Sequence, residues 1–264
     1  MTRKGRGGYK YAKVLFGRKE GFHLSPFYPG YFHLSNALNG LRKVRGKVLD
    51  VGCGQGASTK VIKGYRPDLK VWGIDVSVLS LKEAKKDASG VKFLFGSAYK
   101  IPFKDGAFDA VFSFDTLEHL SFPGRALKEV KRVLKPTGTL ILSCPTEGNL
   151  TTLHGILWRV FGLNLKRKHV GHVQMYTLGQ LRKLFDAHGF RIVKVSWSNY
   201  LYNQTVDLSY FLLLHLLGKK PEERLSQINS PKSFSRLATF INFLESSFFF
   251  FLPGQTVHLI AKKD

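Results

Sequence analysis

The sequence predicts an α/β fold built on a doubly wound, mostly parallel sheet of seven strands. From residue 47 onward, short apolar runs alternate with stretches whose apolar residues recur at helical spacing. Such alternation is typical of right-handed βαβ units, which build parallel sheets. The first apolar run, residues 48–51, leads directly into a glycine-rich turn at 52–56. A strand, a glycine turn and a helix in that order favour a ligand site at the carboxyl edge of the sheet.

Seven short apolar runs supply the expected strands. They are KVLDVG (47–52), KVWGIDV (70–76), VKFLFG (91–96), FDAVFSF (108–114), TLILSC (139–144), RIVKVSW (191–197) and QTVHLIAKK (255–263). Helices are expected from about residues 58 and 78, and over 31–44, 124–135 and 178–188. The helix at 124–135 is the clearest of these, because its apolar residues fall on one face.

The chain is expected to divide into three parts. Residues 1–46 form a basic amino-terminal arm and a cap helix, and residues 47–198 with 254–264 form the α/β domain. Almost sixty residues separate the last two predicted strands, which is too long for a hairpin loop. Residues 199–253 are therefore interpreted as a hydrophobic helical insertion before the last strand.

The charge of the chain is strongly positive. Lysine and arginine number 41 against 18 acidic residues, a formal charge of +23, so an anionic partner is expected, either nucleic acid or acidic lipid. The two cysteines, Cys53 and Cys144, lack the spacing of a disulfide framework or a zinc site, which favours a reducing, cytoplasmic setting. The sequence shows no signal-peptide core and no uncharged run of transmembrane length, so any membrane contact is expected to be peripheral, at the inner membrane face.

The glycine turn carries the strongest chemical signal. It reads Gly52, Gly54, Gly56, so its third glycine comes one residue earlier than in the G-x-G-x-x-G of dinucleotide-binding folds. Asp50 ends the strand before the turn, where it would repel a diphosphate. A carboxylate at that point suits a ligand with an ammonium group.

A second aspartate, Asp75, ends the next strand, 25 residues after Asp50. A carboxylate there can accept hydrogen bonds from both ribose hydroxyls of a nucleoside. Taken alone, either aspartate could instead be a helix cap or a solvated loop residue. The pair at this spacing favours a ligand that contains adenosine.

Five segments resemble the successive motifs of class I methyltransferases that use S-adenosylmethionine, and in particular the small-molecule and ubiquinone-pathway O-methyltransferases. They are LDVGCGQGAS, GIDVS, FGSAYKIPF, FDAVFSFDTLEHL and LKEVKRVLKPTGTLIL. The resemblance covers residues 47–144 and, more loosely, 172–197. It implies a Rossmann-like methyltransferase fold and S-adenosylmethionine as the cofactor.

The resemblance also implies which residues bind that cofactor: Asp50, Gly52, Cys53, Gly54, Asp75, Val76, Ser97, Ala98 and Phe114. Family members usually carry an aspartate where this chain has Ser97. A serine hydroxyl can accept the same hydrogen bond from the adenine amine.

The motif Asp115-x-x-Glu118-His119 follows the fourth strand, where ligands of open α/β sheets lie. It resembles the E-x-x-E-H of ubiquinone-pathway O-methyltransferases, which is associated with a divalent cation. The first acid here is shorter by one methylene, so the identity of a metal, and its presence, stay open. Glu118 and His119 could instead pack over the cofactor without a metal.

Methyl transfer is an in-line displacement at a sulfonium, so the protein mainly aligns the acceptor and, for a hydroxyl, removes its proton. His119 is the first candidate for the base, together with Asp115. His169 and His172 are second candidates, because their segment follows the fifth strand and could close over the acceptor. Each of these histidines could also be a loop or packing residue.

Three other functions were weighed. An RNA methyltransferase fits the charge, but the companion motifs of its cysteine-nucleophile and exocyclic-amine classes are missing, so Cys144 is interpreted as a buried strand-end residue. A non-catalytic binding protein on the same fold would not need the glycine turn and both aspartates. A dehydrogenase is disfavoured by Asp50.

The expected insertion suggests the kind of acceptor. Within residues 237–252, apolar side chains recur at helical spacing, and basic residues lie nearby. That composition suits an interfacial helix on an anionic membrane or a lid over an apolar substrate; two helices that pack on the domain or on a dimer partner are the alternative. A small or lipid-like acceptor, methylated at a hydroxyl, is therefore favoured over nucleic acid.

Overall fold

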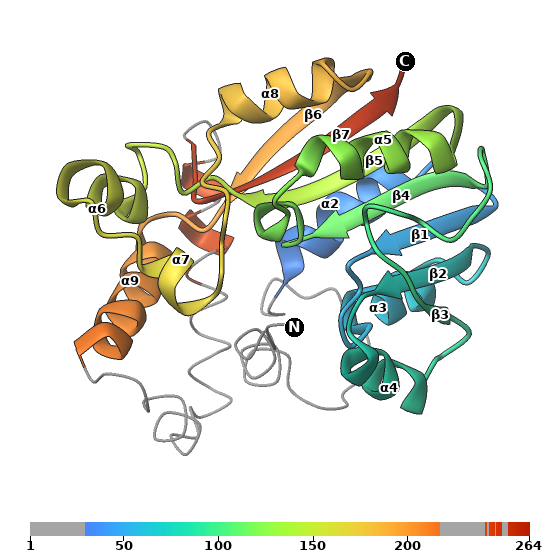
Figure 1. The fold of residues 1–264 in the computed structure, drawn as a ribbon, viewed down its shortest axis with the longest axis horizontal. Helices are drawn as coiled ribbons and strands as arrows, with labels where there is room; N and C mark the ends of the chain where they lie inside the picture. Colours follow the sequence, from blue (N-terminus) through green and yellow to red (C-terminus); the bar gives the residue numbers. More distant parts are fainter. Residues whose placement is uncertain (1–29, 217–240, 242, 246, 250–252) are drawn as a thin grey trace, which may run out of the picture.

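The protein was analysed as a computed structural model, which describes residues 30–216, 241, 243–245, 247–249 and 253–264. These residues form a seven-stranded sheet with helices on both faces (Figure 1). Among the described residues, every helix is too short or too polar to cross a membrane.

The sheet has the strand order β3-β2-β1-β4-β5-β7-β6. The strands are β1 (Lys47–Val51), β2 (Lys70–Asp75), β3 (Lys92–Phe95), β4 (Phe108–Phe114), β5 (Leu134–Pro145), β6 (Phe190–Ser198) and β7 (Thr256–Lys263). Only β7 runs antiparallel, and it lies between β5 and β6. The prediction of a mostly parallel, seven-stranded sheet is confirmed. The fifth strand is longer than predicted, because it begins directly where the preceding helix ends.

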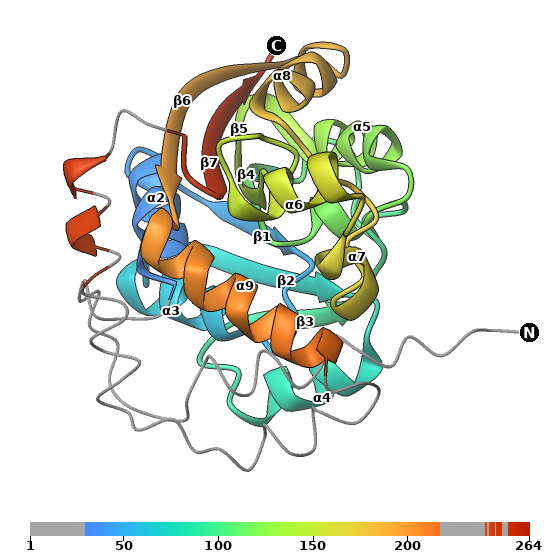
Figure 2. The same ribbon diagram turned by 90° about the vertical axis from the view of Figure 1, so that its left-hand side faces the viewer.

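Two hydrophobic cores lie on opposite faces of the sheet, and alternate residues of the central strands β1, β4 and β5 belong to different cores. One face is covered by α5 (Pro123–Val133) and α8 (Leu178–Asp186). The other is covered by α2 (Tyr31–Leu41), α3 (Ala57–Tyr65) and α4 (Val78–Lys86). Figure 2 shows α5 and α8 on one side of the strands and α2 and α3 on the other.

Three helices lie beyond the carboxyl ends of the strands, and we call them the cap helices: α6 (Leu153–Phe161), α7 (Leu165–His169) and α9 (Leu201–Leu216) (Figure 1). The first two occupy a segment in which no helix was predicted. Both are short, and each begins at a side-chain cap, Thr152 for α6 and Asn164 for α7. Leu165 of α7 is buried against Leu208 and Leu212 of α9. Most of the predicted interfacial helix at 237–252 lies outside the described residues.

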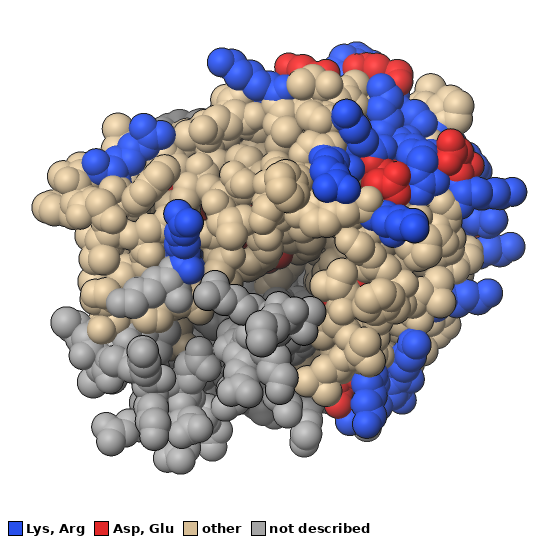
Figure 3. Space-filling model, viewed as in Figure 1, with Lys and Arg blue, Asp and Glu red and all other residues tan. Residues whose placement is uncertain are grey.

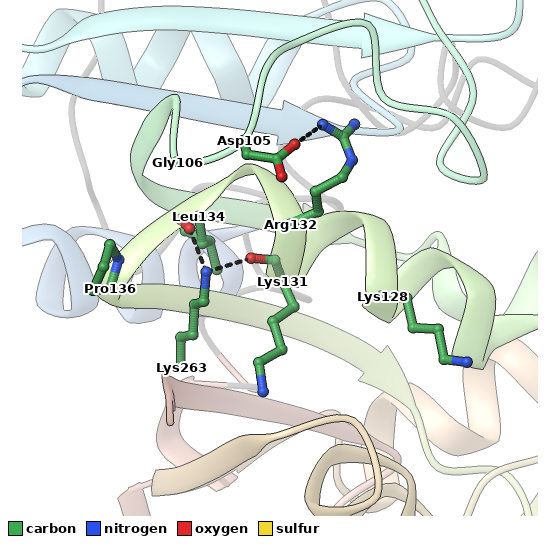
Figure 4. A pocket seen from close by; sticks show the side chains of 8 residues that line it. All are labelled: Asp105, Gly106, Lys128, Lys131, Arg132, Leu134, Pro136 and Lys263. Carbon is green, nitrogen blue, oxygen red and sulfur yellow. Dashed lines mark hydrogen bonds and ion pairs between the residues drawn. The ribbon is translucent and has the colours of Figure 1, made fainter.

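Charge is unevenly distributed over the surface. In Figure 3, lysine and arginine gather at the end of the molecule that holds the amino ends of β1, β2 and β4, while the rest of the described surface in this view is mostly uncharged, with a hollow near the centre of the view. A surface pocket of about 530 Å³ lies at the basic end, between α5 and the ends of β5 and β7. Figure 4 shows Lys263 in that pocket, where its Nζ donates to the carbonyl oxygens of Lys131 and Leu134. The Lys263 ammonium group, which enters the pocket from β7, is thus hydrogen-bonded to main-chain carbonyl oxygens.

Arg132 of α5 also lines this pocket and fixes the loop before β4. Its guanidinium donates to the carbonyl oxygens of Phe103 at 2.7 Å and Ile101 at 2.9 Å, and it pairs with Asp105 and Glu129. Two carbonyl oxygens and two carboxylates therefore depend on the Arg132 guanidinium for their hydrogen bonds.

We predict that Arg132→Met lowers the free energy of unfolding by about 1–3 kcal/mol, because two carbonyls and two carboxylates lose their donor. Urea denaturation of the purified protein measures this. Lys128→Met, an exposed position on the same helix, serves as the control and should change the stability by less than about 0.5 kcal/mol. Equal stability of the two variants would contradict the role assigned to Arg132.

Candidate functional site

The carboxyl ends of β1, β2 and β4 meet along one edge of the sheet and point toward the hollow near the centre of the view (Figures 1 and 3). The glycine turn after β1 folds over the end of β2, because the backbone N–H groups of Gly52 and Cys53 both donate to the carbonyl oxygen of Ile74, at 2.9 and 3.0 Å. Gly52 has a φ of 81°, and a side chain there would collide with the hydroxyl of Thr116. This position requires glycine on both counts.

Asp50 is buried beneath this turn. Its carboxylate accepts a hydrogen bond from the Thr59 hydroxyl at 2.6 Å. Burial raises the pKa of Asp50 to about 7; the bond from Thr59 lowers it and the charge of Asp75 adds to the increase. A buried carboxylate with this pKa is a strong partner for a cation that enters the site.

Asp75 is pinned at the end of β2. One carboxylate oxygen accepts from the N–H of Gly54 and the other from the N–H of Ser77, both at 2.8 Å. Each carboxylate oxygen has a further lone pair, so Asp75 can still accept hydrogen bonds from hydroxyl groups of a ligand.

The remaining predicted cofactor residues lie at the same edge. Val76 is exposed directly after β2, and Gly96, just before Ser97 and Ala98, donates its N–H to the Asp75 carbonyl oxygen. The Ser97 hydroxyl accepts from the N–H of Tyr99 at 3.1 Å. Phe114 is half-buried at the end of β4. Cys53 is half-buried within the turn, and burial raises the pKa of its thiol.

Asp115 turns toward α2. It has a φ of 46°, in the left-handed region, and its two carboxylate oxygens lie 3.4 and 3.3 Å from Nε2 of His33. His33 also packs edge-on against Phe114, with ring centroids 5.5 Å apart. Sequence reasoning missed His33, because a lone histidine in a helical segment carries no spacing signal.

Glu118 and His119, in the short 3₁₀ helix η1 (Leu117–His119), come together with His172 rather than with Asp115. One ligand atom of each of these three side chains lies within 4.8 Å of the other two. The N–H groups of Val173 and Gln174 both donate to the Glu118 carbonyl oxygen at 3.0 Å, which holds the His172 loop over η1.

The Glu118 side chain is fully buried, and its Oε1 has no hydrogen-bond partner. Its Oε2 lies 3.8 Å from the Cys144 thiol. Burial raises the pKa of Glu118 well above its ordinary value, and burial followed by the proximity of His172 lowers the pKa of His119. An unpartnered carboxylate oxygen beside two imidazoles is the arrangement that a bound cation would satisfy.

Behind His172 lies a buried charged network that sequence reasoning missed. Nδ1 of His172 is 2.9 Å from Oε2 of Glu147, just after β5. Nζ of Lys166 on α7 lies 3.3 Å from Oε1 of Glu147 and 2.5 Å from Oδ2 of Asp207 on α9. Burial would raise the pKa of Glu147, but Lys166 and His172 outweigh that effect and lower it to about 2. Glu147 is therefore ionised at neutral pH.

Of the other histidine and cysteine candidates, His169 lies apart from this cluster, whereas Cys144 lies beside Glu118. His169 on α7 contacts His215 of α9, with ring centroids 6.1 Å apart. Cys144 is fully buried at the end of β5, as expected for a strand-end residue, and burial raises the pKa of its thiol well above the ordinary value.

Comparison with known sequences identifies the central part of the chain. A family model described as a methyltransferase domain matches residues 49–142. An uncharacterized methyltransferase of Schizosaccharomyces pombe is 38% identical over 115 residues, 39% of this chain and 40% of that protein. An O-methyltransferase of Aspergillus nomiae is 34% identical over 43% of this chain and 56% of its own length. A demethylmenaquinone methyltransferase of Thermotoga maritima is 35% identical over 36% and 42% respectively. The chain thus spans about half the length of the curated relatives it matches.

Solved structures with the same fold cover more of the chain. The [4+2]-cyclase SpnF has a TM-score of 0.60 and 20% identity over 98% of this chain and 87% of its own. A methyltransferase-like protein of Bacillus halodurans has a TM-score of 0.58 and 20% identity, over 87% and 98%. Together with the strand order 3-2-1-4-5-7-6, these likenesses show that the described residues have the fold of class I methyltransferases, and residues 49–142 match the methyltransferase-domain family.

Proposed function

We propose that this protein transfers the methyl group of S-adenosylmethionine to a hydroxyl oxygen of a small or lipid-like acceptor. The observation that carries the proposal is the pair of aspartates at the glycine turn, Asp50 buried beneath it and Asp75 pinned beside it. Asp75 would hold the ribose, and Asp50 would favour the cationic methionine end. Ser97 and Ala98 would lie beside the adenine.

The acceptor would enter through the hollow at the carboxyl edge. His119 is the proposed base, because its side chain is 40% exposed while the rest of its cluster is buried. Asp115, with His33, lies after the end of β4 and would orient the acceptor. These residues align the hydroxyl for in-line attack on the methyl carbon and take up its proton.

A divalent cation is the alternative to His119 as the base, because an imidazole that binds a metal cannot also take up the acceptor proton, and the residues fit one. Glu118, His119 and His172 would hold it, since the buried Oε1 of Glu118 has no donor and both imidazoles lie within reach. Such an ion would act as a Lewis acid that lowers the pKa of the acceptor hydroxyl.

Two observations favour a small or lipid-like acceptor. Relatives include proteins named as O-methyltransferases and demethylmenaquinone methyltransferases. Large apolar side chains are also exposed on the cap helices, among them Val160 and Phe161 of α6 and Leu201 of α9. Peripheral contact with an anionic membrane would bring such an acceptor to the site.

An RNA substrate is the second candidate, and only the overall charge favours it. Most of the visible lysines and arginines gather at the end of the molecule that holds the amino ends of β1, β2 and β4, away from the carboxyl edge (Figure 3). A strand held there would not be presented to the carboxyl edge.

We predict that Asp75→Ala weakens binding of S-adenosylhomocysteine by about 10- to 100-fold, because the ribose loses its acceptor. Isothermal titration measures this, with NAD as the control ligand. Asp87→Ala, an exposed aspartate after α4, should leave the affinity unchanged. Unchanged affinity in Asp75→Ala would place the ribose elsewhere.

We also predict that the cofactor binds more weakly below neutral pH. The pKa of Asp50 is about 7 in the free protein, so Asp50 is protonated at lower pH and must lose a proton to pair with the ligand ammonium. Affinity should fall by up to about tenfold for each pH unit below 7. Asp50→Asn should bind weakly with little pH dependence between about pH 6 and 8; a wild-type affinity that is flat over this range would contradict the assignment.

For the membrane contact, we predict that Phe248→Asp reduces flotation of the protein with anionic vesicles, since Phe248 is 72% exposed in the expected insertion. The matched control is Val193→Asp, which replaces a half-exposed apolar residue of β6. Equal flotation of wild type and Phe248→Asp would count against a contact through this segment.

A further inference from the structure

We propose that Glu147 is a positioning residue that presents His172 as the third donor, beside Glu118 and His119, to a divalent transition-metal ion. The proposal rests on the cation described under the proposed function, and it specifies the class of metal and the residues behind it.

The position of the proton on His172 follows from the partners of Glu147. Nδ1 of His172 lies 2.9 Å from one oxygen of the Glu147 carboxylate, whose other oxygen faces Nζ of Lys166 at 3.3 Å, so the carboxylate accepts from both groups. Nδ1 therefore carries a proton, and in the neutral ring Nε2 keeps its lone pair. A carboxylate that holds one imidazole nitrogen while the other binds a metal is a recurrent outer-shell arrangement.

The Glu147 carboxylate is itself fixed by its neighbours. Its side chain is 1% exposed, and each carboxylate oxygen has its own partner. Oε2 accepts from His172, while Oε1 lies 3.3 Å from Nζ of Lys166 and 3.4 Å from Nε2 of Gln255. Three partners from separate segments fix the carboxylate, so His172 cannot rotate without breaking a buried hydrogen bond.

The contacts of Glu147 extend to the cap helices. Lys166 also pairs with Asp207 at 2.5 Å, and Nε2 of Gln255 donates to Asp207 at 3.0 Å. Lys166 belongs to α7 and Asp207 to α9. The orientation of His172 therefore depends on the packing of both helices against the end of β5.

The donor set selects the class of metal. Two imidazole nitrogens and one carboxylate oxygen suit Zn²⁺, Co²⁺ or Fe²⁺, whereas Mg²⁺ prefers oxygen ligands and water. A tetrahedral ion with bonds of about 2.1 Å separates its ligand atoms by about 3.4 Å. The three donors lie within 4.8 Å of one another, so closure around an ion needs Glu118 and His119 to move toward His172, which Glu147 holds in place. A fourth position would be open to the acceptor oxygen.

The experiment titrates the full-length, metal-free protein with Co²⁺ and follows its visible absorption, which reports tetrahedral coordination. The wild type should bind one ion per chain, Zn²⁺ should displace it and excess Mg²⁺ should not. Glu147→Gln keeps the size of the side chain but cannot hold Nδ1–H as an ionised acceptor, and it should weaken Co²⁺ binding by about 10- to 100-fold. The matched control is Glu129→Gln, which removes a carboxylate paired with Arg132 at the basic end.

A second variant, His172→Gln, removes the donor itself and leaves the Glu147 and Lys166 pair in place, and it should weaken Co²⁺ binding at least as much. S-adenosylhomocysteine affinities are measured for every variant and should stay close to wild type, and all titrations are made well below the thermal midpoint of each variant. Equal Co²⁺ affinity in wild type and Glu147→Gln, or no stoichiometric Co²⁺ binding by wild type, overturns the proposal. If the wild type does not bind S-adenosylhomocysteine, that result would instead count against the proposed methyl transfer.

Discussion

Two backbone hydrogen bonds to the carbonyl oxygen of Ile74 hold the glycine turn over the end of β2, and the whole cofactor edge depends on them. They set the turn so that the N–H of Gly54 reaches Asp75. The same fold of the chain buries Asp50 next to Thr59. A larger residue at position 52 would collide with Thr116, which follows β4 and directly precedes η1. The glycine turn, the two aspartates and the segment before η1 therefore form one packed unit.

The site is completed from a second direction by the cap helices. The cofactor edge is built from consecutive βα units, whereas the charged network behind His172 joins residues from β5, α7, α9 and the segment before β7. Lys166, placed between two carboxylates, offsets the cost of burying them. The two halves of the site are therefore held in place by different interactions. Main-chain hydrogen bonds position the cofactor side, and buried ion pairs position the acceptor side.

The sequence predicted those features of the fold and the site that depend on local residue patterns. The strands, the helices on the sheet and the positions of Asp50 and Asp75 follow from apolar periodicity and from a turn that only glycine can make. Helices α6 and α7 escaped prediction because both are short; α6 contains Gly155, and α7 consists mostly of basic residues. Glu147, Lys166 and Asp207 could not be predicted, since Lys166 lies 19 residues from Glu147 and 41 from Asp207, and single polar residues in irregular segments carry no period. The pairing of Asp115 with His33 was hidden for the same reason, because 82 residues separate them.

The placement of β7 between β5 and β6 has a kinetic consequence. The gap between those strands can be filled only after residues 199–255 have been synthesised, so the pairings of β7 with β5 and β6 close a long loop late in folding. Until then the edge of β5 is unpaired and open to wrong partners. Gln255, immediately before β7, arrives with that strand, so the network around Glu147 is finished in the same late event, after the cofactor edge has all its residues in place.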